Sequence, residues 1–108
     1  MLCEQGDIIE VSFDPSYGHE PQKRRPALVV STDAFNLRSS LTAVCPITST
    51  DNGYPLHVRI DADDVHGFVC VEALRTLDLQ SRRCERVSVA DATAMGEVLS
   101  LIGAIFGI

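Results

Sequence analysis

The side chains best suited to phosphate chemistry gather in one short segment of the chain, residues 18–26. This segment holds an imidazole, a carboxylate and three cations, which are His19, Glu20, Lys23, Arg24 and Arg25. Because Arg25 opens an apolar stretch that reads as a buried strand, we expect its guanidinium to be held in place, and a fixed, permanently charged fork suits a phosphate group. A histidine changes charge near neutral pH and can act as an acid or a base. Read alone, the segment indicates either a phosphate site or a solvated basic turn.

Two hydroxyl side chains, Thr48 and Ser49, come directly after another apolar stretch, residues 41–47. Hydroxyl groups at the end of a strand can hold phosphate oxygens or merely cap a turn. Glu72 closes a further apolar stretch, and its carboxylate could titrate in a reaction or pair with Arg75. The residues alone leave each of these alternatives open.

The four cysteines and three histidines form no metal-ligand pattern. No C-x-x-C or H-x-x-x-H pair occurs in the sequence, and we therefore expect neither a zinc site nor a cofactor. Cys45 and Cys70 lie in apolar stretches, which predicts buried or half-buried thiols in a reducing cytoplasm rather than a secreted disulfide framework. We expect His57 to face outward from a strand and His66 to lie in a turn.

Most of the chain alternates or clusters apolar residues over short lengths, which is typical of β-strands. Residues 7–13 alternate, which predicts a half-buried strand. Residues 25–31 carry four successive apolar residues, which predicts a strand covered on both faces. Pro46 cannot donate a hydrogen bond to a ladder, so we expect weak pairing there or an edge strand. Further strands are predicted over residues 41–47, 55–61, 67–72 and 75–79.

The period changes near the C-terminus, where apolar residues recur every three or four positions. Ser88 and Asp91 have the spacing of a capping box, and an amphipathic helix is expected to follow them. The residues expected on its buried face are Ala92, Met95, Leu99, Ile102 and Phe106. Thr32 is expected to cap a helical turn over residues 32–36. Short strands followed by one terminal helix indicate a small, strongly bent antiparallel barrel.

Length, composition and charge limit the class of protein. The 108 residues suffice for one domain, expected to span residues 1–108, and the 45% hydrophobic content is that of a globular protein. Neither a membrane span nor a signal peptide is indicated. The net charge of −6 at first argues against a nucleic-acid partner, because phosphate contacts need cations. Six of the nine cations, however, fall in residues 23–25 and 82–86, which predicts a polarised surface with a local basic patch.

Taken in chain order, several short motifs resemble those of one known family. They are Gly6-Asp7-Ile8, Phe13-Asp14-Pro15, Gly18-His19-Glu20, Arg25-Pro26-Ala27, Pro46-Ile47-Thr48 and Arg75-Thr76-Leu77-Asp78. Across residues 6–106 the sequence is similar to the PemK/MazF toxins of bacterial toxin–antitoxin pairs, and within that family to the ChpB and Kid branch. The resemblance implies a mainly β, α+β fold: a small SH3-like barrel of the PemK/MazF/CcdB type with a C-terminal helix. It also implies a homodimer.

The resemblance further implies an activity, the metal-independent and sequence-specific cleavage of single-stranded mRNA. In that reaction the 2′-hydroxyl of the RNA attacks the adjacent phosphate, and the products carry a 2′,3′-cyclic phosphate and a 5′-hydroxyl. Arg25 and Thr48 stand at positions that match the family's motifs. The resemblance implies that Arg25 would stabilise the transition-state phosphate and that Thr48 would hydrogen-bond it. Glu20 and His19 would supply acid–base groups. The residues expected to bind substrate are Lys23, Arg24, Ser49 and Glu72.

One strand end departs from the pattern of the Kid branch. That branch has Arg-Cys-Asp where this chain has Cys70-Val71-Glu72, and its arginine and aspartate are implicated in cleavage. The acid and base assignments of the branch therefore do not transfer as a set. We expect catalysis in this chain to rest on Arg25, Thr48 and the segment before Arg25.

The resemblance implies a cognate antitoxin as partner, with its contact centred on Lys23, Arg24 and Arg25. DNA would be reached only through the antitoxin, and no membrane contact is expected. Two other functions are compatible with the same fold: a CcdB-like gyrase inhibitor, or an SH3-like module that holds RNA or a peptide without cutting it. A ribonuclease needs Arg25 together with Thr48, whereas a gyrase binder does not. The lack of tryptophan, with only two tyrosines, speaks against a module that binds by stacking.

Overall fold

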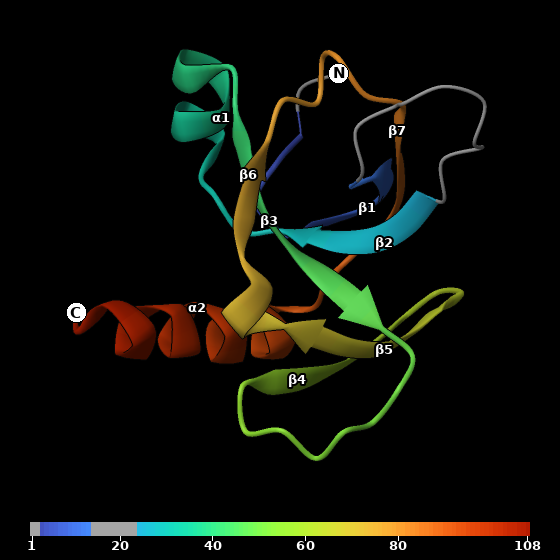
Figure 1. Cartoon of the computed structure of the whole chain (residues 1–108), viewed down its shortest axis with the longest axis vertical. Coiled ribbons are helices and arrows are strands. Elements are labelled where there is room, and N and C mark those ends of the chain that lie inside the picture. The colour runs from blue at the N-terminus through green and yellow to red at the C-terminus, as the bar shows by residue number, and fades with distance from the viewer. Residues whose placement is uncertain (1–2, 14–23) are drawn as a thin grey trace.

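The computed structural model describes residues 3–13 and 24–108, and most of these form one curled antiparallel sheet with two α-helices and one short 3-10 helix (Figure 1). The strands are β1 (Asp7–Ser12), β2 (Arg24–Val29), β3 (Thr42–Thr48), β4 (His57–Ala62), β5 (Val65–Cys70), β6 (Arg75–Leu77) and β7 (Cys84–Val89). The helices are α1 (Asp33–Ser39), the short 3-10 helix η1 (Val71–Ala73) and α2 (Ala92–Phe106). Six strands follow the order β4-β5-β3-β2-β1-β7, and β6 pairs with β3. The mainly β, α+β class and the terminal helix are as predicted.

Two apolar clusters lie on opposite faces of the sheet. The first, here called the helix-side core, includes Ile8, Leu28 and Val98 of α2. The second core includes Ile9 and Val11 on the other face of β1. The prediction that β2 is covered on both faces is confirmed. The prediction of a half-buried β1 is wrong, because β1 lies between β2 and β7 and has a core on each side.

β3 changes its pairing partner at Pro46. Thr42–Val44 pair with β6, whereas Ile47 and Thr48 pair with β5, and the residues between have no register partner on that side. On its other side β3 pairs with β2, where Pro46 lies opposite Ala27. Weak pairing at the proline is therefore confirmed on one side only. The alternative of an edge strand is wrong, since β3 is central to the sheet.

α2 begins after Asp91, whose carboxylate accepts a hydrogen bond from the amide of Ala94 at 2.7 Å. The capping box predicted from Ser88 and Asp91 does not form, because Asp91 is itself the N-cap and Ser88 lies in β7, where it donates its hydroxyl to Asp63 at 2.6 Å. The buried positions of α2 are Ala94 and Val98, with Met95, Leu101 and Ile102 half-buried against the helix-side core. The predicted buried stripe is thus rotated, because Ala92, Leu99 and Phe106 are exposed. None of the helices in the described ranges is long and apolar enough to cross a membrane.

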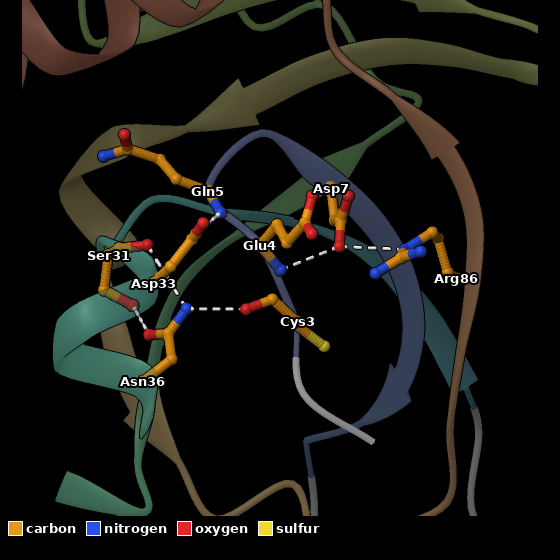
Figure 2. A network of polar contacts seen from close by, with 8 residues as sticks. All are labelled: Cys3, Glu4, Gln5, Asp7, Ser31, Asp33, Asn36 and Arg86. Carbon is orange, nitrogen blue, oxygen red and sulfur yellow. Dashed lines mark hydrogen bonds and ion pairs between the residues drawn. The ribbon is translucent and has the colours of Figure 1, made fainter. Parts of the chain in front are cut away.

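A polar network fixes the first described residues to the sheet (Figure 2). The buried carboxylate of Asp7 accepts hydrogen bonds from the amide of Glu4 and from Nε of Arg86, each at 2.9 Å. The buried Asn36 donates to the carbonyl of Cys3 at 2.9 Å and accepts from the hydroxyl of Ser31. Asp7, which belongs to one of the family-like motifs, and Asn36 therefore have structural roles here.

The four cysteines are free. Cys3 and Cys45 are buried, and Cys70 and Cys84 are half-buried, which confirms the predicted environment of Cys45 and Cys70. Burial raises the pKa of the Cys45 thiol to about 12, with smaller contributions from neighbouring Cys70 and Glu72. Burial, followed by the nearby Cys84, raises the pKa of the Cys3 thiol to about 12 as well. These two thiols are therefore protonated and unreactive at neutral pH.

Candidate functional site

The sheet brings Arg25 and Thr48 to one face of adjacent strands. β2 and β3 pair as far as Ala27 and Pro46, and the next residues on the same face of the two antiparallel strands are Arg25 and Thr48. Thr48 in turn pairs with Phe68 of β5. Side chains directly opposite one another project from the same face of a sheet. Arg25, Thr48 and Phe68 consequently form a row across three strands, on the face that carries the second core.

An open pocket of about 430 Å³ surrounds this row. It is lined by Glu10, Arg25, Pro26, Ile47, Thr48, Ser49, Thr50, Asp64, Val65 and His66. The pocket is therefore built from the ends of four strands and two loops, and it brings together three of the residues singled out from the sequence: Arg25, Thr48 and Ser49.

The groups in this pocket are available to an anionic ligand. The side chain of Arg25 is exposed and makes no ion pair or hydrogen bond among residues 3–13 and 24–108, so the expectation that its guanidinium is held in place is wrong. Thr48 accepts a hydrogen bond from the amide of Thr50 at 3.2 Å, which fixes its side chain and leaves its hydroxyl proton free to donate. Ser49 is exposed beside it. A free guanidinium facing a positioned hydroxyl is an arrangement that can hold the oxygens of a phosphate.

The remaining sequence-predicted site residues do not join this pocket. Arg24 points toward β7 and makes a loose ion pair with Glu85 at 3.4 Å. Glu72 lies in η1, where its carboxylate bonds Nε2 of His57 at 3.0 Å and lines an apolar hollow against α2. The pairing of Glu72 with Arg75 considered from the sequence does not form; Arg75 instead stacks over Phe13, 5.6 Å from the ring centre. His19, Glu20 and Lys23 lie outside the described residues.

The second predicted basic cluster is engaged in the fold. Arg86 pairs with Asp7, and Arg82 donates to the carbonyl of Ser12 at 3.0 Å. These two cations therefore serve the β1–β7 edge, whereas Arg83 of the same cluster is exposed.

Three titratable groups of the pocket, Glu10, Asp64 and His66, were not identified as site residues from the sequence. Glu10 pairs with Pro26 beside Arg25. His66 was expected in a turn, but it belongs to β5, where it stands opposite Asp61 of β4 and bonds it at 2.9 Å. Neither placement follows from local sequence pattern, because both depend on the register between strands that are distant in the chain.

His57, Cys70 and Glu72 are the residues that could hold a metal ion. Their ligand atoms all lie within 4.8 Å of one another, although nothing in their spacing along the sequence indicated this. The prediction that His57 faces outward is wrong, since only 7% of its side chain is exposed. Its ring packs edge-on against Tyr54 at 5.2 Å, and its Nδ1 is buried without a partner among the described residues. This cluster is separate from the Arg25–Thr48 pocket.

Comparison with known proteins gives one consistent result. The family model for the PemK-like, MazF-like toxin of type II toxin–antitoxin systems matches residues 4–106. The chain is 40% identical to the endoribonuclease toxin ChpB of Escherichia coli K12, covering 94% of this chain and 92% of that protein. It is 36% identical to the endoribonuclease PemK of Escherichia coli, covering 94% and 80%.

Solved structures agree with the sequence relatives. A MazE–MazF complex from Deinococcus radiodurans contains a chain that superposes with a TM-score of 0.89 at 38% identity, covering 100% of this chain and 98% of that one. MazF from the same organism superposes with a TM-score of 0.86, also at 38% identity, covering 100% and 99%. The curled half-barrel with its terminal helix is thus the fold of MazF structures, and the chain belongs to the PemK-like, MazF-like family of toxins from type II toxin–antitoxin systems.

Proposed function

We propose that this chain is the toxin of a toxin–antitoxin pair and acts as an endoribonuclease on single-stranded mRNA. The observation that carries the proposal is the unpaired guanidinium of Arg25 facing the hydroxyl of Thr48 in an open pocket. The relatives named as endoribonucleases support it, at 40% identity for ChpB and 36% for PemK. They do not favour a gyrase inhibitor on the same fold.

In the proposed reaction the RNA supplies its own nucleophile. The 2′-hydroxyl attacks the neighbouring phosphorus, the bond to the 5′ oxygen breaks, and the products carry a 2′,3′-cyclic phosphate and a 5′-hydroxyl. Arg25 stabilises the negative charge that develops on the phosphate oxygens, and Thr48 donates a hydrogen bond to one of them. Because the nucleophile is internal and the charge is met by a guanidinium, the reaction needs no metal ion.

Roles are also proposed for the other sequence-predicted residues, of which only Ser49 lines this pocket among the described residues. Glu20 and His19 lie a few residues before Arg25 in the chain and are proposed as acid–base groups. Lys23, Arg24 and Ser49 are proposed to contact the RNA backbone as it enters and leaves the pocket. Glu72 is proposed as a more distant substrate contact, since it lies near the far end of β5.

We also propose that residues 1–108 form a single SH3-like barrel domain that acts as a homodimer. An apolar surface near the C-terminus supports a dimer: Phe106 is 65% exposed and Ile108 is 96% exposed, beside a hollow of about 210 Å³ between α2 and η1. Contiguous exposed apolar groups mark association surfaces. Sedimentation at micromolar concentration should give the mass of two chains, and Phe106→Asp should give the mass of one. A wild-type mass near one chain would contradict the dimer.

The antitoxin partner rests on the structural relatives, which include MazE–MazF complexes. The proposed contact covers Arg25 and its neighbours, where an acidic segment would find a free cation and would compete with RNA. Co-purification with an antitoxin should therefore suppress RNA cleavage.

End-group analysis tests the proposed reaction. The purified protein is incubated with a long single-stranded transcript in EDTA, and fragment ends are identified by mass spectrometry. We expect 2′,3′-cyclic phosphate ends, and no cleavage of an all-deoxy strand of the same sequence, because that strand lacks the nucleophile. Products with 5′-phosphate ends, or cleavage that stops in EDTA, would contradict the mechanism.

A further inference from the structure

We propose that His66 is the catalytic base that takes the proton from the attacking 2′-hydroxyl, with Asp61 as its positioning residue. The inference rests on the proposed ribonuclease function and adds a group to the same pocket. It is carried by the placement of His66 beside Thr48 and by its hydrogen bond to Asp61.

The strand register brings His66 to the phosphate-binding row. Thr48 pairs with Phe68, and His66 is two residues before Phe68 on the same strand, so it projects from the same face as Thr48. Diagonal neighbours of this kind lie roughly 7–8 Å apart, which leaves space for one phosphodiester between them. His66 also lines the pocket together with Arg25.

Gly67 explains how closely β5 approaches at this point. A Cβ atom on residue 67 would lie 2.3 Å from the carbonyl oxygen of Thr48 and 3.2 Å from Cγ2 of Ile47. Only glycine at position 67 permits β5 to approach β3 this closely. The backbone between His66 and Phe68 is therefore held directly against Thr48, and the imidazole is placed by the sheet rather than by a loop.

The hydrogen bond to Asp61 fixes the protonation pattern of the ring. Asp61 Oδ1 lies 2.9 Å from His66 Nδ1, and Asp61 Oδ2 lies 3.0 Å from Arg59 Nε. Hydrogen bonds from Arg59 first, and from His66 second, lower the pKa of Asp61, so at neutral pH it is a carboxylate and can only accept. Nδ1 must then carry the proton, and the neutral ring offers the lone pair of Nε2 to the pocket.

Nε2 has no hydrogen-bond partner within residues 3–13 and 24–108. The charged and titratable groups around the ring come from several elements, namely Arg59 and Asp61 of β4, Asp64 of the turn, Glu10 of β1 and Arg25 of β2. The positive charge of a protonated His66 ring would be balanced by the three carboxylates among these groups. The site can therefore hold the proton that the base accepts.

Proton transfer accompanies the change of bonds at phosphorus. Nε2 of His66 takes the proton of the 2′-hydroxyl while the 2′ oxygen forms its bond to phosphorus. The bond from phosphorus to the 5′ oxygen breaks, and that oxygen takes a proton from water in the open pocket. The imidazolium later returns its proton to solvent. No oxidant, metal or additional reactant takes part.

Steady-state kinetics of the full-length protein test this assignment, on an RNA oligonucleotide spanning a cleavage site mapped with the wild type. His66→Gln should lower kcat by about 10²–10³-fold, with KM within about threefold. The rise of kcat/KM with pH that a general base produces should also disappear. His66→Gln should fold normally, because the side chain is 64% exposed, and an unchanged melting temperature checks this. Asp61→Asn should lower kcat about tenfold and keep the pH-dependent rise, because the imidazole remains.

Two controls separate a base from other roles. Glu97→Gln changes an exposed titratable side chain on α2, outside the pocket, and it should leave kcat within about threefold. A substrate with sulfur in place of the 5′ oxygen has a leaving group that needs no proton, and it should not restore cleavage by His66→Gln. Restoration would identify His66 as an acid and overturn the assignment, as would a change in KM alone or wild-type activity in His66→Gln. If the wild-type protein cleaved no RNA, the proposed function itself would fail instead.

Discussion

Replacing Gly67 by alanine tests how the pocket is built. The new Cβ would stand 2.3 Å from the carbonyl oxygen of Thr48 and 3.1 Å from its carbonyl carbon. Real Cβ contacts shorter than 3.0 Å essentially never occur, so the two strands must separate by at least about 0.7 Å. The obstacle is backbone, which cannot rotate away as a flexible side chain would.

The cost of Gly67→Ala follows from the small size of this junction. β3 and β5 share only the pairs Ile47–Val69 and Thr48–Phe68, and these join the β4–β5 hairpin to the rest of the sheet. Overpacking a core costs about 1–3 kcal/mol, and a rigid backbone contact belongs at the upper end. We therefore expect a loss of about 3 kcal/mol in the free energy of unfolding, which corresponds to roughly 13 °C in melting temperature.

The same displacement should impair the site. A misplacement on the order of 1 Å can reduce a catalysed rate by about 10²-fold, so Gly67→Ala should lower kcat at least tenfold under conditions where it remains folded. Urea unfolding followed by circular dichroism, together with RNA cleavage, measures both effects.

Gly96→Ala is the matched control for this experiment. A Cβ at Gly96 would meet nothing within 4 Å, and the residue is exposed within α2. This change should stabilise the protein by roughly 0.5–1 kcal/mol, because alanine favours a helix over glycine. If Gly67→Ala were as stable and as active as the wild type, the glycine would not set the separation between β3 and β5.

Other interactions lead to further measurable expectations. Arg86→Met leaves the buried Asp7 carboxylate with one donor fewer, and urea unfolding should show a loss of about 1–2 kcal/mol, whereas Arg83→Met on the exposed surface should stay within about 0.5 kcal/mol. The Cys45 thiol has a pKa of about 12 in the fold against 9.0 for a free thiol, so only the unfolded chain ionises it between these values. The free energy of unfolding should be insensitive to this thiol below pH 9.0 and should fall above it, by up to roughly 1.4 kcal/mol per pH unit. Cys45→Ala should flatten the fall measured between pH 8 and 10, and an equally steep fall would refute this origin.

Strands were predicted correctly where the alternation of apolar and polar residues matches the alternation of buried and exposed side chains. The prediction failed where packing against a neighbouring element reverses which of these side chains are buried. β4 alternates and buries Val58 and Ile60 as expected. β7 was not predicted because its alternation is inverted: Ser88 is buried while Val89 is 59% exposed. The register shift between Ile8 and Ile9 on the partner strand β1 accompanies this inversion, and no local pattern in residues 84–89 encodes it.

Helix periodicity located α2 but not the face that it buries. Apolar residues occur around most of its circumference, so the sequence alone could not select the stripe through Val98 over the stripe through Leu99. Packing against β4 and η1 made that choice.

The residues of the candidate site were likewise only partly predictable from the local sequence. Arg25 and Thr48 were found from short motifs, because each motif lies within one strand end. His66 and Glu10 were missed as members of the pocket, because their approach to Arg25 depends on cross-strand register. Glu72 was assigned by position in the chain, and the turn into η1 directs it toward His57 instead.

Whether the Arg25–Thr48 pocket is the centre of RNA cleavage is decided by the cleavage rate of Arg25→Ala in EDTA. Arg38→Ala, which removes an exposed arginine from the last turn of α1, is the matched control. We expect Arg25→Ala to lose at least about 10²-fold in kcat, because the developing phosphate charge is left without its cation, while Arg38→Ala cleaves like the wild type. Undiminished cleavage by a folded Arg25→Ala protein would contradict the assignment of this pocket.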